Sequence, residues 1–339
     1  MREKFMKLKI SAFILLLFIA AAGYAENAGS RGSYTRGGWA GAEYAAAGMT
    51  GEVLADDVFS IYWNPAGLTE LRVRKKLTES QITEKAKQGN IDDITEEDLL
   101  NFSESDANRL FFNIGASYTK LDIEREAGFA GCAFNFFKGV IGTGLYSITS
   151  SDIETRDDNG ALTGTQNYSG SEGFLSYAIQ WNIISFGVSV KGYYESIGES
   201  TYSGAGADAG FQIFLLPFIK LGVMVRDAGG FLQPQDATDS ENRYDFFSPQ
   251  IKTGIAFLSD AGVKIALSGS KKLEQSEFEY GVGVEYDISE FLTMTMGLAD
   301  NYFSAGFILK VMDMDLSYAI NYDKIDFGYN NTVSLALLF

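Results

Sequence analysis

The sequence predicts an all-β membrane protein: an outer-membrane β-barrel of about 14 antiparallel strands with an N-terminal hatch and a short helical insertion. Three observations predict this class. The chain of 339 residues begins like an exported protein. After that start, no apolar run reaches the ~18 residues that a membrane-spanning helix needs. From residue 110 onward, bulky apolar residues alternate with small or polar ones over segments of about 10–13 residues, the length of a tilted membrane-spanning strand.

Residues 1–25 have the three parts of a secretory signal peptide. Basic residues precede an apolar core at 11–22, and Gly23-Tyr24-Ala25 has the small-x-small pattern of a cleavage site. No cysteine follows this site, which excludes attachment through a lipidated N-terminal cysteine. We expect a cleaved signal peptide and a location in the outer membrane of a diderm bacterium.

The composition argues against several classes of protein. The formal net charge is -17, and it becomes -20 once the signal peptide takes away four basic residues and one acidic one. A chain this acidic is a poor ligand for nucleic acid. It contains no histidine and one cysteine, Cys132, which we interpret as an apolar filler in a strand. Histidine-based catalytic triads and metal sites are therefore excluded, and we predict no enzyme activity, no metal and no cofactor.

Residues 26–71 do not resemble strands, and we predict that they form the hatch. Residues 26–50 are rich in Gly and Ala, so they gain little from packing among themselves. The most motif-like stretch of the chain follows at 55–68. It contains adjacent carboxylates, an apolar and aromatic run, and a turn in which Pro fixes its own backbone and Asn initiates the bend. The carboxylates are Asp56 and Asp57, and the turn is Asn64-Pro65-Ala66-Gly67.

Residues 72–109 differ from both neighbouring regions because they are densely charged and contain one glycine. Two places have a capping residue followed by an acceptor side chain, which is typical of helix starts. We expect short helices near 79–88 and 95–106. The segment is interpreted as a solvated insertion, with a docking surface for a periplasmic partner as the alternative.

The barrel is predicted to span 110–339. The expected strands are 110–119, 126–137, 139–150, 170–181, 183–196, 205–216, 218–229, 247–259, 261–271, 277–288, 291–300, 302–311, 313–323 and 327–339. Their connections alternate between tight turns and longer loops, and the two longest loops, 151–169 and 230–246, fall at the same end. Short turns at one end and long loops at the other are typical of outer-membrane barrels.

Aromatic residues support the same topology. Phe137, Trp181, Phe218 and Phe291 border the tight turns, where an interfacial girdle is expected. The chain ends on Phe339, the last residue of an alternating apolar strand. This ending matches the C-terminal signal by which the barrel-assembly machinery recognises its clients.

A barrel of this size has a lumen too wide for small side chains to fill, since about eight strands already leave only enough room for side chains. The predicted inward charges are Lys191, Lys220, Arg226, Lys252, Lys264, Glu279, Glu285, Lys310 and Asp315. They are interpreted as a hydrated polar lumen. The hatch is the natural plug, because Asp56 and Asp57 would meet these lysines. Phe59, Ile61, Tyr62 and Trp63 would supply an apolar surface, and we hypothesise that they line or gate a path for a hydrophobic ligand.

The stretch from Asp56 to Leu68 resembles the N-terminal signature of the FadL-like superfamily, which includes long-chain fatty-acid transporters, aromatic-hydrocarbon channels and the PorV/PorQ branch. Its residues, Asp-Asp followed by Ile-Tyr-Trp-Asn-Pro-Ala-Gly-Leu, are most similar to those of the PorV/PorQ branch and of related spirochaete-type proteins. The resemblance implies a 14-strand barrel whose hatch carries an Asn-Pro-Ala turn. The charged segment 72–109 departs from the fatty-acid transporter pattern.

Two functions follow as expectations. The first is a passive channel for hydrophobic small molecules such as long-chain fatty acids, gated by the hatch. The second is a PorV-like platform that binds exported proteins and transports nothing. In both cases we expect the partners to include outer-membrane lipid and, through Phe339, the barrel-assembly machinery.

Overall fold

The structure is a computed structural model that describes residues 37–71, 111–122, 124–235, 244–259, 261–273, 278–300, 302–323 and 328–339. The predicted signal peptide (1–25), the first part of the predicted hatch (26–36) and the predicted helices of the insertion (72–109) lie outside these residues. Among the described residues, no helix is both long and apolar enough to cross a membrane.

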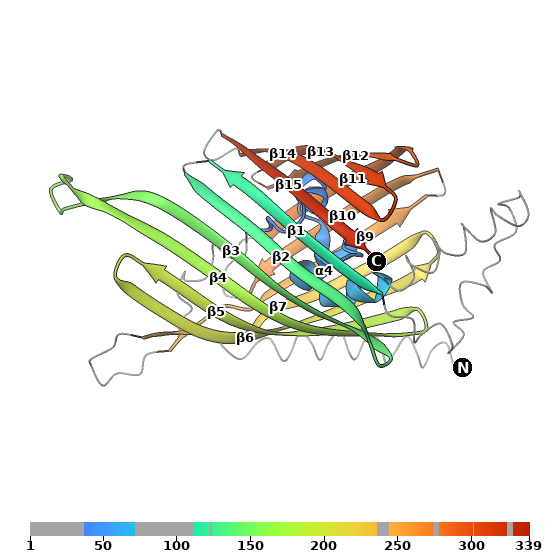
Figure 1. Cartoon of the computed structure of the whole chain (residues 1–339), viewed down its shortest axis with the longest axis horizontal. Helices are drawn as coiled ribbons and strands as arrows, with labels where there is room; N and C mark the ends of the chain where they lie inside the picture. Colours follow the sequence, from blue (N-terminus) through green and yellow to red (C-terminus); the bar gives the residue numbers. More distant parts are fainter. Residues whose placement is uncertain are drawn as a thin grey trace, which may run out of the picture.

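The predicted 14-strand antiparallel barrel is confirmed (Figure 1). The long strands are β1 (Phe112–Leu121), β2 (Arg125–Phe136), β3 (Gly139–Arg156), β4 (Leu162–Trp181), β5 (Ile184–Ile197), β6 (Ser200–Leu216), β7 (Ile219–Pro234), β9 (Gln250–Leu258), β10 (Val263–Lys272), β11 (Phe278–Ser289), β12 (Leu292–Ala299), β13 (Tyr302–Val311), β14 (Met314–Asp323) and β15 (Tyr329–Leu338). A two-residue strand, β8 (Asp245–Phe246), pairs with the end of β7. The wall closes because β1 pairs with both β2 and β15 and β7 pairs with both β6 and β9.

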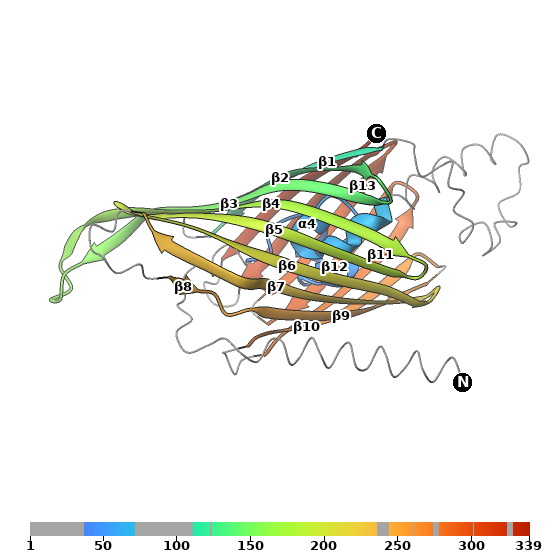
Figure 2. The same ribbon diagram turned by 90° about the horizontal axis from the view of Figure 1, so that it is seen from below.

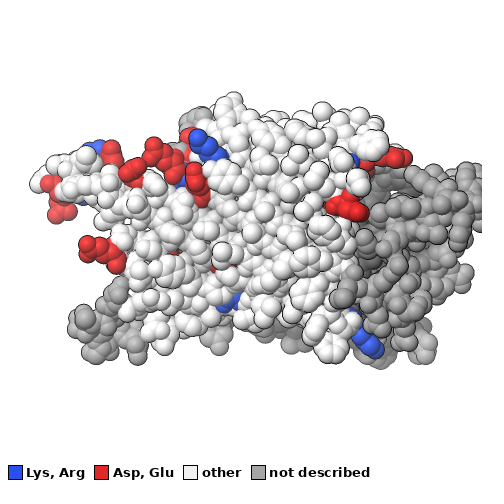
Figure 3. Space-filling view, viewed as in Figure 1, with Lys and Arg blue, Asp and Glu red and all other residues white. Residues whose placement is uncertain are grey.

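The alternation of the sequence becomes the two faces of the wall. In β5, Phe186 and Val190 point outward and are 42% and 64% exposed, whereas Ser189 and Lys191 point inward and are 1% exposed. On the outside, charged side chains gather at the two ends and leave a nearly uncharged band between them (Figure 3). An apolar outer band between two polar rims is what a lipid-embedded barrel requires.

The two ends of the barrel differ as expected, with one difference in detail. The predicted loop 151–169 is largely a hairpin, because β3 and β4 continue as a ribbon that projects beyond the rest of the wall (Figure 2). Both faces of this ribbon are polar or exposed, so the period-two pattern disappears while the backbone pairing continues. Likewise, β7 extends to Pro234 into the predicted loop 230–246. By outer-membrane topology, this end is extracellular and the short-turn end is periplasmic.

Four short helical elements lie inside the barrel (Figures 1 and 2). They are α2 (Ala42–Ala46), α3 (Gly51–Leu54), α4 (Ser60–Trp63) and the 3₁₀ helix η3 (Pro65–Thr69). We call residues 37–71 the plug. Nearly all of its side chains are buried, and together with inward-facing residues of the wall they form the main hydrophobic core. The core of the molecule is therefore the contact between plug and wall.

Candidate functional site: the plug and its two walls

The plug folds from short elements because glycines and a proline divide it. Gly41 starts α2 with a left-handed backbone (φ 87°), and Gly48 (φ 65°) and Met49 (φ 61°) form a left-handed turn between α2 and α3. A positive φ is strained for any residue other than glycine, so Met49 is held there by its surroundings. Pro65 occupies the first turn of η3, where its missing N–H costs nothing.

The turn Asn64-Pro65-Ala66-Gly67 joins the plug to itself and to the wall. The Asn64 side chain is fully buried; its Oδ1 accepts from the Ala66 N–H at 3.1 Å and its Nδ2 donates to the Glu52 carbonyl at 2.8 Å. The same Nδ2 lies 3.4 Å from the Phe211 carbonyl of β6. Gly67 is required because a Cβ there would overlap the Ala55 carbonyl. The sequence motif is therefore a capped 3₁₀ turn that bridges three parts of the structure.

The predicted carboxylates Asp56 and Asp57 have different surroundings. Asp57 is buried, and its Oδ1 accepts from the Phe59 N–H at 2.9 Å, which satisfies a free donor at the start of α4. The N–H of Val58, between these two residues, donates to Asn113 Oδ1 of β1 at 2.9 Å. Asp56 instead lines a small cavity together with Lys264. The structure therefore places Asp56 at the same cavity as Lys264, one of the expected lysines.

The four predicted ligand-path residues, Phe59, Ile61, Tyr62 and Trp63, are all at most 1% exposed. Three of them pack as follows. Phe59 packs on Phe129 of β2, with ring centroids 5.5 Å apart. Tyr62 packs on Tyr146 of β3 at 4.9 Å, and Trp63 Nε1 donates to the Ala40 carbonyl at 2.5 Å. These side chains form the packed centre of the plug, and their role in a ligand path stays a prediction.

We call β2–β7 the packed wall, because it buries a cluster of charges against the plug. Lys191 Nζ lies 3.0 Å from Asp208 Oδ1 and also pairs with Asp227. Arg226 donates to Glu172 Oε2 at 3.1 Å, and its guanidinium carbon lies 4.3 Å above the Tyr62 ring. All five charged side chains of this cluster are at most 2% exposed. The sequence pattern indicates the two cations as inward charges but not the three acids. Glu172 and Asp208 share the parity of inward-facing residues on their strands, whereas Asp227 directly follows Arg226 and breaks the alternation of β7.

Burying three carboxylates and two cations is tolerable only because they pair and hydrogen-bond with one another. Tyr193 donates to Asp227 Oδ1 at 2.6 Å, and the Asp227 N–H donates to Asp208 Oδ1 at 2.8 Å. Asp227 itself has a left-handed backbone (φ 58°), where the pairing of β6 and β7 shifts register. The cluster therefore fixes an irregular part of the wall against the plug.

Glu52 is a second residue that the sequence analysis missed. It is fully buried in the plug, and no hydrogen bond to its carboxylate oxygens is found within the described residues. Lys252 Nζ of β9 lies 3.9 Å away, over the Trp63 ring. Burial raises the pKa of Glu52 to about 7, and Lys252 opposes that rise. All five charged side chains in plug residues 37–71 are acidic, so any opposite charge that they meet comes from outside this segment, as Lys220 does for Glu70.

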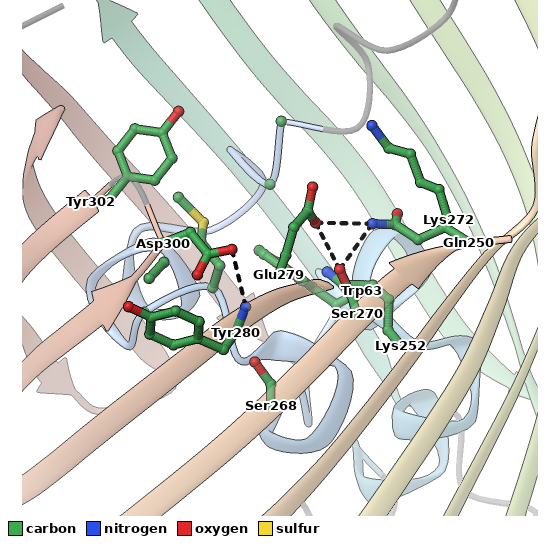
Figure 4. Close-up of a pocket in the computed structure, with 15 residues that line it drawn as sticks. Trp63, Gln250, Lys252, Ser268, Ser270, Lys272, Glu279, Tyr280, Asp300 and Tyr302 are labelled. Atoms are coloured by element: carbon green, nitrogen blue, oxygen red, sulfur yellow. Dashed lines mark hydrogen bonds between the residues drawn. The ribbon is translucent and has the colours of Figure 1, made fainter. Parts of the chain in front are cut away.

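We call β9–β14 the pocket wall, because two cavities open between it and the plug. The larger, about 240 Å³, lies toward the extracellular end and is lined by Lys252, Lys272 and Trp63 among others (Figure 4). Gln250 donates to Glu279 Oε2 and Ser270 Oγ across its side. The smaller, about 30 Å³, lies toward the periplasmic end. It is lined by plug residues including Asp56 and by Lys264 and Lys310.

Inward-facing glycines let the plug approach the wall backbone closely. At each of them an added Cβ would lie 3.0 Å or less from a plug atom, so the plug could not sit where it does. They are distributed around the barrel at Gly115, Gly142, Gly187, Gly210, Gly222, Gly254, Gly281, Gly283, Gly297 and Gly306. The period-two alternation placed these glycines on the inward face but did not indicate what they contact. Among the described residues, no group of three or more carboxylate or thiol side chains is arranged to hold a metal ion.

Comparison with known proteins places this architecture. No protein-family model and no curated protein matches the sequence. Among solved structures, the Pseudomonas putida toluene transporter TodX is 12% identical and superposes with a TM-score of 0.55 over 88% of this chain and 96% of its own. CymD, a monoaromatic hydrocarbon channel, has the same values. A Pseudomonas aeruginosa FadL homologue is 9% identical, with a TM-score of 0.52 over 89% of this chain and 97% of its own.

The chain has the fold of these channels. At such low identity the likeness establishes the fold, and it supports the FadL-like architecture that the sequence motif implied. The proximity to the PorV/PorQ branch stays a prediction. Two of these neighbours, TodX and CymD, are named as a transporter and a channel, and the shared fold is that of an outer-membrane β-barrel.

Proposed function

We propose that the protein is a passive outer-membrane channel for hydrophobic small molecules, with long-chain fatty acids as the substrate class and the plug as its gate. One observation carries the proposal: residues 37–71 fill the lumen of a 14-strand barrel and leave one cavity toward each end of it. A lumen of this width would otherwise leak. The shared fold with hydrocarbon channels supports the same conclusion.

The first test removes the gate. Deletion of residues 26–71 should raise nonspecific ion conductance in planar bilayers, because the inward side chains of the wall do not fill the lumen. The control is that the truncated barrel still migrates as a folded, heat-modifiable band in gels. A folded barrel with unchanged conductance would contradict the assignment of a plug.

The second test concerns the substrate. Uptake of labelled oleate into proteoliposomes should exceed that into protein-free liposomes. The uptake of oleate should be compared with that of a monoaromatic hydrocarbon such as toluene, because two proteins of the same fold are named for such compounds. Uptake of toluene without oleate would overturn the fatty-acid assignment and keep the channel.

A second function is favoured by one feature, the projecting β3–β4 ribbon. Its tip carries exposed acids, including Glu154, Asp157 and Asp158, and stands clear of the barrel (Figure 2). Such a ribbon suits a PorV-like platform for exported proteins. Co-purification of secreted partners that is lost when the ribbon is shortened, together with absent oleate uptake, would favour this function.

A further inference from the structure

The two cavities lie between the plug and the same wall. One lies toward the extracellular end of the barrel and the other toward the periplasmic end. On β10, Ser268 lines the larger cavity and Lys264 lines the smaller one. The two positions are four residue steps apart, which corresponds to about 13 Å along a strand at about 3.3 Å per residue. Strands β11 and β13 also contribute to both cavities, with Glu279 and Glu285 on β11. A path along this wall is therefore already hollow at its two ends.

One row of inward-facing residues separates the cavities. Ala266, Gly283 and Gly297 are neighbours in register on β10, β11 and β12. The plug segment 46–48 lies directly on this row: a Cβ at Gly283 would overlap the Ala47 carbonyl, and a Cβ at Gly297 would overlap the Gly48 amide. On this wall, the plug backbone at Ala47 and Gly48 packs directly on wall glycines and closes the path between the two cavities.

The segment that makes this closure is the strained part of the plug. Gly48 and Met49 have consecutive left-handed backbones. Met49 is partly exposed and lines the larger cavity. A left-handed backbone is strained at a residue other than glycine, so displacement of the turn would relieve the strain at Met49. The opposite flank of the plug is held by the aromatic centre and the buried charge cluster of the packed wall.

We propose that substrate passes the plug along β10–β13, from the larger cavity to the smaller, when the 46–49 turn moves off Gly283 and Gly297 while the rest of the plug stays docked. This inference rests on the proposed channel function and names the route. The route carries charges of both signs. The larger cavity is lined by two lysines and two acids, which are Lys252, Lys272, Glu279 and Asp300. The smaller is lined by two lysines and four acids, which are Lys264, Lys310, Glu43, Asp56, Glu285 and Asp315. A charged headgroup on this route would therefore respond to a change of charge at a lining residue.

The test measures flux of a fluorescent alkyl sulfonate into proteoliposomes, since a headgroup that stays charged crosses the bilayer itself slowly. Gly297→Ala adds a methyl group where the turn rests, and overpacking of this kind destabilises the closed position. We expect flux to rise about tenfold, which corresponds to about 1.4 kcal/mol on the closed position. Gly187→Ala, whose Cβ would overlap Pro65 on the packed wall, is the matched control and should change flux less than about twofold.

A charge reversal then maps the route. Added to Gly297→Ala, Lys264→Glu should reduce the flux of the anionic probe several-fold, whereas Lys220→Glu on β7 should not. Both lysines point inward near the periplasmic end, and each pairs with one carboxylate. Lys264 pairs with Glu285 on the pocket wall, whereas Lys220 lies on the packed wall and pairs with Glu70 of the plug. Equal effects, or a loss with Lys220→Glu alone, would overturn the route. If Gly297→Ala does not assemble, the same two reversals in the unaltered protein make the same comparison.

Failure of the route and failure of the function give different results. If the unaltered protein and Gly297→Ala both carry no probe, the proposed function is wrong for anionic amphiphiles. Ion conductance of Gly297→Ala in planar bilayers then decides the route. Openings whose ion selectivity shifts with Lys264→Glu, and not with Lys220→Glu, support it; absent or insensitive openings overturn it.

Discussion

The plug meets the two halves of the barrel in different ways. Against the packed wall it presents Phe59 and Tyr62, which stack on wall aromatics, and Arg226 reaches over Tyr62 from a buried ionic cluster. Against the pocket wall, the turn at 46–49 rests on glycines between two cavities. Side-chain packing and paired charges resist displacement, whereas a backbone turn on glycines can move without breaking buried ion pairs. The difference indicates that one side of the plug anchors it and the other side can yield.

The largest expected effect comes from breaking the ionic cluster of the packed wall. Lys191→Met removes the partner shared by Asp208 and Asp227 and leaves buried carboxylates unpaired. The loss should be about 3–5 kcal/mol of unfolding free energy, measured by urea titration in detergent. Lys252→Met on the pocket wall should cost clearly less, because its pair with Glu52 is 3.9 Å long and opens to a cavity. Equal losses at the two positions would contradict the proposed division between the walls.

The double variant Lys191→Met/Asp227→Asn sharpens this prediction. It removes one positive and one negative charge together, so it should recover part of the loss of Lys191→Met. No recovery would mean that packing of the lysine stem, rather than charge pairing, holds this part of the wall.

The second effect is a dependence of plug docking on pH. Burial raises the pKa of Glu52 from 4.5 to about 7, so the docked plug binds a proton that a released plug gives up. The resulting stabilisation is fully present below about pH 4.5 and is lost as pH rises through about 7, with an upper limit of ~3 kcal/mol. Protease protection of the plug should therefore be stronger at pH 5 than at pH 8.

The matched variant is Glu52→Gln, which keeps the shape and cannot ionise. It should remove the part of the pH dependence that Glu52 contributes and so raise protection at pH 8 toward that at pH 5. Burial also raises the pKa of Glu70, so a slope of the same sign should remain. A wild-type slope that survives unchanged in Glu52→Gln would contradict this origin.

The sequence predicted the barrel because period-two alternation is a local signal that each strand carries by itself. It predicted Asn64 and Pro65 as a turn because their chemistry is also local. Glu52 and the acids around Lys191 were missed because their meaning depends on partners far along the chain; Glu172 and Arg226 are 54 residues apart. The same holds for Phe59 and Tyr62. Their apolar character was evident, but burial against β2 and β3 depends on how the plug sits in the closed barrel.

The smallest expected effect comes from replacing two buried asparagines. Asn64 of the plug faces the packed wall, and Asn321 lies on the pocket wall. Asn64→Ala removes the cap of η3 and the hydrogen bond to Glu52, and leaves the Ala66 N–H buried without its acceptor. Asn321→Ala on β14 removes a single donor to the Ala45 carbonyl at 2.8 Å. Both side chains are fully buried, so accessibility does not distinguish them. The expected losses are about 2 kcal/mol for Asn64→Ala and about 1 kcal/mol for Asn321→Ala.

Release of the plug in urea provides the measurement, followed by fluorescence of Trp39 and Trp63 in a Trp181→Phe background. Those two of the three tryptophans lie in the plug, and Trp181 is on the barrel surface. A larger loss for Asn321→Ala would mean that the pocket wall holds the plug more firmly than its cavities suggest. In that case the 46–49 turn could not be the part that yields, because the residue beside it would be the stronger anchor.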